Sequence, residues 1–464
     1  GTSLPPATIF VDGKEVRTLP GELVDLCAFE HSLQVMNDFT RWSVWALNTG
    51  RPTKNRLSVF LVPLHPSGAI DFVMMRKHVL EPFSGDWSLI ADNQHEDIIV
   101  LNSNENGRTY LLKTIRFDLS PQSPVPEILA AERKGNFGTY YDYFVDKWHR
   151  ARRPARVSKD GPLLEVQRVE KQSDGGYLLD GLSFQSKVDD RTFFIPRDCC
   201  VWLPYPALLR QAYAALPPLS RRATDLYRTQ MARRRLSIPW IPENLLIEAL
   251  TIPSAVLGFN NQRLETLGDA VLEICTTVHL FNMYPNRHEG QLSILRAQYV
   301  ANRFLLHRAS EHGLQEFLTS ERAPVQRWRY VKPWDVEDDS DLPPRTVKVT
   351  YPRRCLQDCM ESLLAASFLH GGIDMALRTG TALGLNFGGT TPWRVRYQRL
   401  GSDVPATALF NTLQELLRYE FHSNSLLVEA VTHPSFASLG STSYQRLEFL
   451  GDGERTISLC GRMC

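Results

Sequence analysis

The chain has no hydrophobic run long enough to cross a membrane. Its 464 residues contain no uninterrupted apolar stretch of 18 or more, whereas a transmembrane helix needs about 20 mostly apolar residues. The first residues, GTSLPP, include no Met and no charged segment followed by an apolar one, so no secretion leader is expected at this end. We therefore predict no membrane partner.

Cysteine and net charge are also scarce. The eight cysteines are scattered and mostly stand in apolar contexts. This favours free thiols in a reduced intracellular compartment, cytoplasmic or nuclear, over a disulfide framework or a zinc site. The 52 basic and 51 acidic residues nearly balance, which leaves a formal net charge of +1. Any binding of nucleic acid must therefore depend on local basic patches.

Residue composition and periodicity divide the chain into five segments. Residues 1–135 and 136–218 mix short β-rich runs with Gly, Pro and Asn turns, which predicts an α+β or mostly β region. Helical periodicity dominates residues 219–390, apart from VKPWDVEDDSDLPPRT, which is typical of a surface loop. Residues 391–404 are predicted as a linker, and helical periodicity resumes over 405–464. The fold class expected is multi-domain, with an α+β or mostly β part followed by all-α parts.

An internal repeat organises the second half of the chain. NLLIEALTIPSA, from Asn244, aligns with SLLVEAVTHPSF, from Ser425. QRLETLGD, from Gln262, aligns with QRLEFLGD, from Gln445. Two blocks in the same order and in nearly constant register indicate two copies of one helical domain.

Two carboxylates stand one helical turn apart in the first copy. In RLETLGDAVLEI the apolar residues predict a buried helical stripe, and Glu265 and Asp269 point to the same side of the helix. Like charges at this spacing repel, and Gly268 between them costs roughly 1 kcal/mol relative to Ala. This combination favours a cation site with room for close approach, and a solvated acidic face is the alternative.

A second carboxylate pair lies in the helical segment RRCLQDCMESLLAASFLHGG. Asp358 and Glu361 are three residues apart, and so they also share one side of a helix. Two helices that bring four carboxylates together would bind a hard divalent cation through oxygen, with Mg²⁺ favoured and Mn²⁺ as the alternative. Such a site can activate water and stabilise charge that develops on a phosphodiester.

These motifs resemble the ribonuclease III family, which cleaves double-stranded RNA. The resemblance covers roughly residues 222–390 and consists of RLE-x-LGD, then HEGQLSILRAQYVAN, then the D-x-x-E helix. It implies that the metal-binding and catalytic carboxylates are Glu265, Asp269, Asp358 and Glu361. Gln262 departs from the pattern, because many family members carry an acid at this position.

The tandem arrangement resembles Dicer-like proteins of the fungal type. Thr266 in the first copy and Phe449 in the second resemble the asymmetry between Dicer's two ribonuclease domains. DGPLLEVQRV and the segment after it resemble the end of a PAZ domain and its connector helix, so residues 136–218 are expected to be PAZ-like. Residues 1–135 resemble the platform region only weakly. No GxxxxGK[ST] loop is present, so the helicase half of Dicers is expected to lie outside this chain.

Two basic clusters are candidates for RNA contact. The first lies within Lys147–Lys159 and the second just before the carboxylate-bearing segment; the candidate residues are Lys147, Arg150, Arg152, Arg153, Arg156, Arg233, Arg234 and Arg235. They would contact phosphate and ribose by shape more than by sequence. A solvated linker or helix face is the alternative. The aromatic residues Tyr140, Tyr141, Tyr143 and Phe144 could stack on an RNA 3′ end, although we favour a core position for most of them.

The second copy departs from the family pattern after Asp452. The resemblance implies that two copies pair about a pseudo-two-fold axis and cut both RNA strands, with Phe449 as an anchor at the interface. After Asp452, however, the expected small residue and apolar helix are replaced by GERTISLCGRMC. Glu448 and Asp452 are therefore expected to form an incomplete second site. We expect residues 405–464 to be poorly ordered or to depend on a partner.

These patterns together predict a Dicer-like, Mg²⁺-dependent endoribonuclease. It would hydrolyse phosphodiester bonds in double-stranded RNA and yield small interfering RNA for silencing and antiviral defence. The alternative is a catalytically impaired fragment that binds double-stranded RNA. A further alternative is a homodimer in which first domains from two chains pair.

Overall fold

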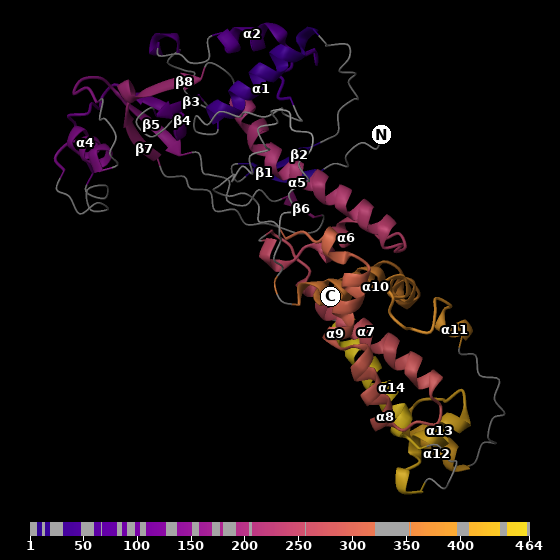
Figure 1. Ribbon diagram of the computed structural model, residues 1–464. Helices are drawn as coiled ribbons and strands as arrows, with labels where there is room; N and C mark the ends of the chain where they lie inside the picture. The colour runs from indigo at the N-terminus through magenta and orange to yellow at the C-terminus, as the bar shows by residue number, and fades with distance from the viewer. Residues whose placement is uncertain are drawn as a thin grey trace. The chain divides into compact units, whose positions relative to one another are not determined.

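The chain folds into two compact units, which are described separately. The computed structural model describes residues 7–11, 14–18, 31–47, 60–65, 67–80, 86–90, 98–102, 108–126, 137–150, 157–168, 177–179, 192–203, 207–255, 257–320, 352, 354–396, 408–436 and 443–461. The first unit holds the described residues up to Ser220, except Leu179, and the second holds those from Arg221 onward. The first unit contains all the described strands, and the second is helical (Figure 1).

A five-stranded antiparallel sheet forms the main layer of the first unit. Its strand order is β7 (Thr192–Pro196), β5 (Leu163–Arg168), β4 (Arg108–Arg116), β3 (Ile99–Asn102) and β8 (Cys200–Leu203). Helix α4 (Tyr140–Arg150) packs its aromatic side chains into the same core as these strands. Tyr140 and Phe144 are only 3% and 2% exposed, which confirms their interpretation as core residues.

A smaller sheet and two helices complete the first unit. The sheet has the order β2 (Lys14–Thr18), β1 (Ala7–Val11) and β6 (Tyr177–Leu178). Helices α1 (Leu33–Leu47) and α2 (Phe72–Leu80) bury Met36, Phe39 and Met75 between them. The β-rich run RLSVFLVPL behaves differently from the prediction: its described part, from Phe60, forms only an isolated bridge at Leu64. The Leu61 N–H donates to Thr40 Oγ1 of α1 at 2.9 Å, which takes this donor away from a sheet.

The long helix α5 (Ala207–Arg235) starts before the expected boundary at residue 219. It continues through Pro217 and Pro218, two residues that have no N–H and normally interrupt a helix. The sequence pattern therefore places the start of this helix too late.

The second unit contains nine further helices among its described residues. They are α6 (Glu243–Leu250), α7 (Gln262–Met283), α8 (Glu289–Tyr299), α9 (Asn302–Glu311), α10 (Cys355–Ala382), α11 (Trp393–Arg396), α12 (Ala408–Leu417), α13 (Asn424–Val431) and α14 (Gln445–Gly461). None of the helices in the described part of the chain combines the length and apolar character that a membrane span requires.

Helices α7 and α10 form the centre of the second unit. Leu264, Leu267 and Val271 of α7 are 4%, 1% and 0% exposed, and Met360 and Leu363 of α10 are fully buried. These residues confirm the predicted apolar stripes, and each such side chain stabilises the fold by about 1.5–3 kcal/mol. The two stripes fix which sides of α7 and α10 face each other, and hence where their carboxylates lie.

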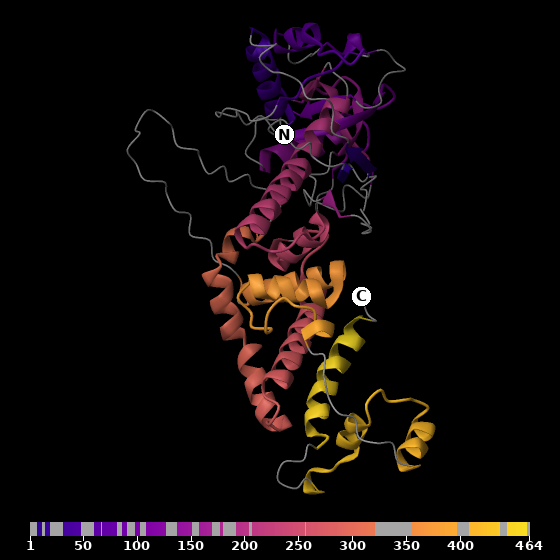
Figure 2. The same cartoon turned by 90° about the vertical axis from the view of Figure 1, so that its right-hand side faces the viewer.

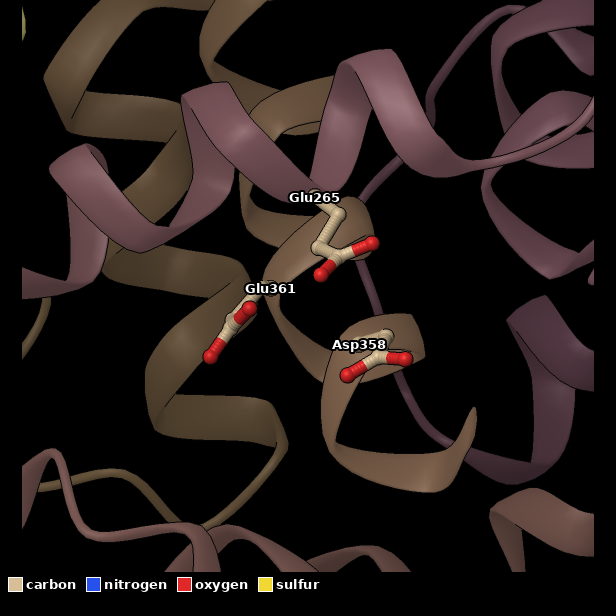
Figure 3. Close-up of side chains that lie close together, drawn as sticks. All are labelled: Glu265, Asp358 and Glu361. Atoms are coloured by element: carbon tan, nitrogen blue, oxygen red, sulfur yellow. The ribbon is translucent and has the colours of Figure 1, made fainter. Parts of the chain in front are cut away.

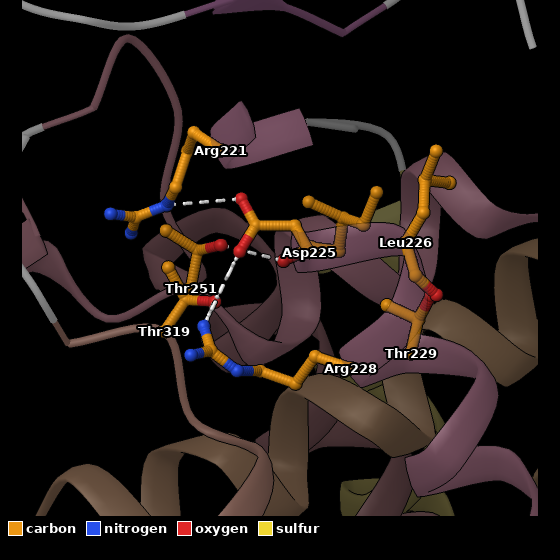
Figure 4. A network of polar contacts seen from close by, with 8 residues as sticks. Arg221, Asp225, Leu226, Arg228, Thr229, Thr251 and Thr319 are labelled. Carbon is orange, nitrogen blue, oxygen red and sulfur yellow. Dashed lines mark hydrogen bonds and ion pairs between the residues drawn. The ribbon is translucent and has the colours of Figure 1, made fainter. Parts of the chain in front are cut away.

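A buried ionic network ties the end of α5 to this helical core (Figure 4). Asp225, which is 1% exposed, accepts hydrogen bonds from Arg221 Nε (3.2 Å), Arg228 Nη1 (3.3 Å) and Thr319 Oγ1 (3.0 Å). Arg228 Nη1 also donates to Thr319 Oγ1 at 2.6 Å. Thr319 in turn forms a parallel bridge with Thr251, which follows α6. Segments that are far apart in the sequence therefore meet at one buried carboxylate.

The internal repeat is visible in the backbone. The sequence α6, η5 (Pro253–Ala255) and α7 in the first copy recurs as α13, η7 (Pro434–Phe436) and α14 in the second. Even the turn hydrogen bonds correspond: the N–H of Glu265 donates to the Asn261 carbonyl and that of Glu448 to the Tyr444 carbonyl, both at 2.8 Å. The structure therefore confirms two copies of one motif.

The second copy forms helices and rests on the first. Helix α14 continues to Gly461, well beyond Asp452 where the family pattern ends. It packs along α7 and α8, as both views show (Figures 1 and 2). The structure shows this contact of α14 with the first copy, and the expectation that residues 405–464 are poorly ordered or depend on a partner stays a prediction.

Candidate metal centre

Three of the four predicted carboxylates meet between α7 and α10. Glu265 comes from the first turns of α7, and Asp358 and Glu361 come from the first turns of α10 (Figure 3). One carboxylate oxygen from each lies within 4.8 Å of the others. The predicted helical spacing explains this meeting, because each pair projects from a single side of its helix.

Gly268 allows the two helices to approach so closely. A Cβ added at Gly268 would overlap the main-chain carbonyl of Glu361. No rotamer change could relieve that contact, because the obstacle is backbone. The sequence suggests that Gly268 leaves room for a close approach. In the structure, the group that approaches is the backbone of α10.

The carboxylates of this centre resist ionisation. Burial raises the pKa of Glu361 to about 8, and the neighbouring Asp269, Asp358 and Glu265 add to the increase. Burial, followed by repulsion from Asp358 and Asp269, raises the pKa of Glu265. Burial also raises the pKa of Asp358, against the opposing effect of Arg354. When ionised, these carboxylates would therefore carry more negative charge than the surrounding residues neutralise.

Asp269 lies beside this group rather than inside it. It is more exposed than the other three, and burial still raises the pKa of its carboxyl. Its charge acts on both Glu361 and Glu265, which places it next to them. Gln262 is exposed at the start of α7.

A divalent cation fits this arrangement. The donors are all carboxylate oxygens, which suit hard cations such as Mg²⁺ or Mn²⁺. Oxygens about 2.1 Å from one Mg²⁺ lie at most about 4.2 Å apart, so small side-chain rotations would bring the three together around one ion. A bound cation would also relieve the repulsion that raises these pKa values.

The second copy has no comparable group. Glu448 and Asp452 are both exposed on α14. Gly451 occupies the position of Gly268, and a Cβ added there meets no neighbour within 4 Å among the described residues. In the part of the chain that the structure describes, Glu265, Asp358 and Glu361 form the one group of three or more metal-ligating side chains.

The predicted RNA-contact residues have varied surroundings. Lys147 is half-buried and its ammonium lies 5.3 Å from the centre of the Phe144 ring, while Arg150 is the last residue of α4. Arg152, Arg153 and Arg156 lie outside the described residues.

The three arginines that end α5 differ from one another. Arg233 Nη2 donates to the Ile241 carbonyl at 3.3 Å, and Arg235 pairs with Glu316 at 2.5 Å. Arg234 is exposed. Arg234 is therefore the member of this cluster whose side chain is best placed to meet a ligand.

The family resemblance implies one residue of the contact between the two copies, and the structure adds two more. Phe449 is 1% exposed and lies in a cluster with Leu280, Phe281 and Leu292, as expected of an anchor. The guanidinium groups of Arg296 and Arg446 lie over rings in this cluster, and the family resemblance does not point to either residue. A signal for Arg446 does exist, because the repeated QRLE motif carries it in both copies.

Comparison with known proteins confirms the resemblance. Residues 262–372 match the ribonuclease III domain family. The chain is 28% identical over 423 residues to endoribonuclease Dicer homolog 1 of Arabidopsis thaliana, covering 81% of this chain and 22% of that protein. It is 31% identical over 283 residues to Dicer-like protein 2 of Pyricularia oryzae, covering 58% of this chain and 18% of that protein. The chain thus spans about a fifth of the length of these relatives.

Among solved structures, the crystal structure of Dicer from Giardia intestinalis matches 81% of this chain and 53% of its own. The sequence identity is 17% and the TM-score is 0.40.

Proposed function

We propose that this chain, which belongs to the Dicer-like ribonuclease III family, is an endoribonuclease that hydrolyses phosphodiester bonds in double-stranded RNA. The observation that carries the proposal is the group of Glu265, Asp358 and Glu361, with Asp269 beside it. The reaction would depend on Mg²⁺, with Mn²⁺ as the alternative. Its products would serve RNA silencing and antiviral defence in a cytoplasmic or nuclear setting.

The carboxylates would hold the cation, and Glu361 would release a proton when the cation binds. When bound, a divalent cation supplies a nucleophile at neutral pH and stabilises charge on the phosphodiester. Glu361, with a pKa of about 8, is largely protonated at neutral pH without a cation. It would release this proton as the ion binds, because ligation requires the carboxylate form. The backbone contact at Gly268 keeps α7 and α10 at the separation that this ligand set needs.

Binding of the duplex would rest on basic side chains outside the centre. We assign phosphate contacts first to Arg234, and then to Lys147, Arg150, Arg152, Arg153 and Arg156. Arg233 and Arg235 would contribute charge while keeping their contacts to Ile241 and Glu316. Residues 1–135, 136–218 and 219–390 would act as platform-like, PAZ-like and catalytic segments, with 391–404 as a linker to the second copy at 405–464.

A second candidate function is binding of double-stranded RNA without double-strand cleavage. The observation in its favour is the second copy, where Glu448 and Asp452 are exposed and Gly451 faces open space within the described structure. Two cut strands require two centres. The first copy alone would therefore nick one strand or bind without cutting.

A Mg²⁺ titration separates the two candidates. Cleavage and binding of one RNA duplex are measured on the same protein samples, with and without the cation. The enzyme requires the cation for turnover, whereas binding through phosphate contacts persists without it and weakens with salt. Cation-dependent cutting supports the proposal. Intact binding with no cutting at any Mg²⁺ or Mn²⁺ concentration would replace it with the RNA-binding function.

A further inference from the structure

Asn261 stands where α7 begins, and its side chain does not cap that helix. Asparagine is often found at this position, because its side chain can accept a hydrogen bond from an N–H of the first turn. Here the side chain makes no such bond. The residue is only 1% exposed, and both polar atoms of its amide, Oδ1 and Nδ2, are buried without a hydrogen-bond partner in the part of the chain that the structure describes. A buried polar group without a partner is costly and rare in native proteins, so this amide needs an explanation other than capping.

The backbone at this junction does not require an asparagine. The Asn261 N–H donates to the Thr251 carbonyl at 2.9 Å, which joins the end of α6 to the start of α7. In the second copy the equivalent residue is Tyr444, whose N–H donates to the Thr432 carbonyl at 3.1 Å. The same turn therefore forms with a side chain of different size and chemistry. Asparagine stands in the copy whose carboxylates meet, and tyrosine stands in the copy whose carboxylates are exposed.

Asn261 lies beside the carboxylates of both helices. Its backbone angles are helical, and positions 261, 265 and 269 are each four apart, so Asn261 shares the side of α7 that carries Glu265 and Asp269. Side chains on a helix lean towards its N-terminus, so the Glu265 carboxyl leans over the turn that Asn261 begins. On α10, Ser362 Oγ lies 2.6 Å from the Asp358 carbonyl oxygen and 3.3 Å from that of Asn261, within hydrogen-bond distance of both. The buried amide therefore stands at the edge of the carboxylate centre.

We propose that Asn261 is a positioning residue of the cation centre, which holds Glu265 in place through one buried water molecule. The inference rests on the proposed function only in requiring that the centre binds a divalent cation. In this arrangement Asn261 Nδ2 donates to the water, and the water donates to the Glu265 carboxylate. Buried waters commonly join polar groups that have no partner in the protein. Held in this way, the carboxylate needs no reorientation when it becomes a ligand.

Binding of Mn²⁺ to the full chain without RNA tests this role, with the free ion measured by its electron paramagnetic resonance signal. Asn261→Leu keeps roughly the volume of the side chain and removes both polar atoms. We expect it to lower the affinity for Mn²⁺ by about 10–100-fold, as is typical when a group that orients a metal ligand is lost. Asn282→Leu is the matched control, because Asn282 lies on the same helix and its amide donates to the Val278 carbonyl at 2.7 Å. Equal Mn²⁺ affinity in Asn261→Leu and the original chain would overturn the proposal.

Asn261→Asp separates a role at the centre from a role in folding. An aspartate has nearly the same shape, still accepts a hydrogen bond from the water and adds a negative charge beside Glu265. Saturating Mn²⁺ should therefore raise the midpoint of thermal unfolding by more in Asn261→Asp than in the original chain. An increase no larger than that of the original chain would contradict a position beside the centre. If Asn261→Leu does not fold, this measurement decides alone.

Failure of this inference and failure of the proposed function give different results. An original chain that binds no Mn²⁺ would overturn both, because each requires a cation at the centre. Mn²⁺ binding that weakens in Asn261→Leu, in a chain that cuts no RNA duplex, would support the positioning role and overturn the nuclease. Mn²⁺ binding and RNA cutting that are both unchanged in Asn261→Leu would overturn the positioning role alone.

Discussion

Gly268 of α7 lies directly against the main-chain carbonyl of Glu361 in α10. This one contact sets the distance between the helix that carries Glu265 and Asp269 and the helix that carries Asp358 and Glu361. The corresponding glycine of the second copy, Gly451, has no neighbour within 4 Å among the described residues. The same sequence motif therefore has two structural outcomes.

The two glycines should respond in opposite ways to alanine. Gly268→Ala forces α7 and α10 apart, so it should lower the free energy of unfolding by at least about 2 kcal/mol and weaken cation binding. Gly451→Ala is the matched control. It should be neutral or should stabilise α14 by up to about 1 kcal/mol, because alanine is the better helix former. Thermal unfolding of both variants checks this, and equal effects would show that Gly268 does not set the helix separation.

Stability without a cation should fall as pH rises. The pKa of Glu361 is raised from 4.5 to about 8, so its contribution is fully present below pH 4.5 and is lost as pH rises through 8. The pKa is also raised for Glu265, Asp269 and Asp358, so these groups also lower the stability as pH rises. The free energy of unfolding should therefore be lower at about pH 8.5 than at about pH 5, by on the order of a few kcal/mol. The midpoint temperature of thermal unfolding should be lower at the higher pH as well.

Two comparisons isolate the cause of that pH dependence. Glu361→Gln, which cannot ionise, should lose much of the decrease. Saturating Mg²⁺ or Mn²⁺ should raise the midpoint at the higher pH in the original chain, because a ligand that binds the folded state stabilises it. A midpoint that rises with pH and ignores both cations would be incompatible with a carboxylate centre that binds metal.

Removing the charge of Asp225 should destabilise the junction between α5 and the helical core. Asp225→Asn would leave Arg221 and Arg228 without their buried carboxylate partner, at a cost of about 3 kcal/mol. Glu316→Gln breaks the exposed pair with Arg235 instead, and should cost less than about 1 kcal/mol. Chemical denaturation of the two variants checks the contrast. If both variants lost a similar free energy of unfolding, burial of the Asp225 network would contribute little to stability.

Arg234 should contribute to RNA affinity without sequence preference. Arg234→Gln should weaken duplex binding equally for unrelated sequences and reduce the slope of log affinity against log salt by about 1. Filter-binding or fluorescence titrations at several salt concentrations measure both quantities. Arg308→Gln is a suitable comparison, because Arg308 is already paired with Glu311. An unchanged slope of log affinity against log salt would show that Arg234 does not contact an RNA phosphate.

Sequence spacing predicts the centre well because it fixes side-chain direction. The four-residue and three-residue separations of the carboxylates, together with the apolar stripes beside them, determine which side of each helix is acidic. The family resemblance likewise implies Phe449 as an anchor. Spacing cannot show that Glu361 meets Gly268 through its backbone, because that contact joins residues 93 positions apart.

Other features depend on tertiary contacts that local patterns do not contain. Pro217 and Pro218 suggest a break in the helix, yet α5 continues through them. The run from Phe60 to Leu64 has strand character, but Leu61 is bound to Thr40 of α1. The stacking of Arg296 on Phe449 joins the two copies, and neither residue alone predicts it.

Cleavage in Mg²⁺ of an RNA duplex whose two strands carry different labels tests most directly whether the α7–α10 carboxylates form a nuclease centre. The original chain is compared with Asp269→Asn, Glu361→Gln and, as a control, Glu311→Gln on the exposed part of α9. We expect cation-dependent cutting by the original chain and by the control. Both centre variants should lose on the order of 100-fold or more, because the centre provides several kcal/mol of charge stabilisation. Cutting that persists in both would contradict the assignment of the α7–α10 carboxylates as the nuclease centre.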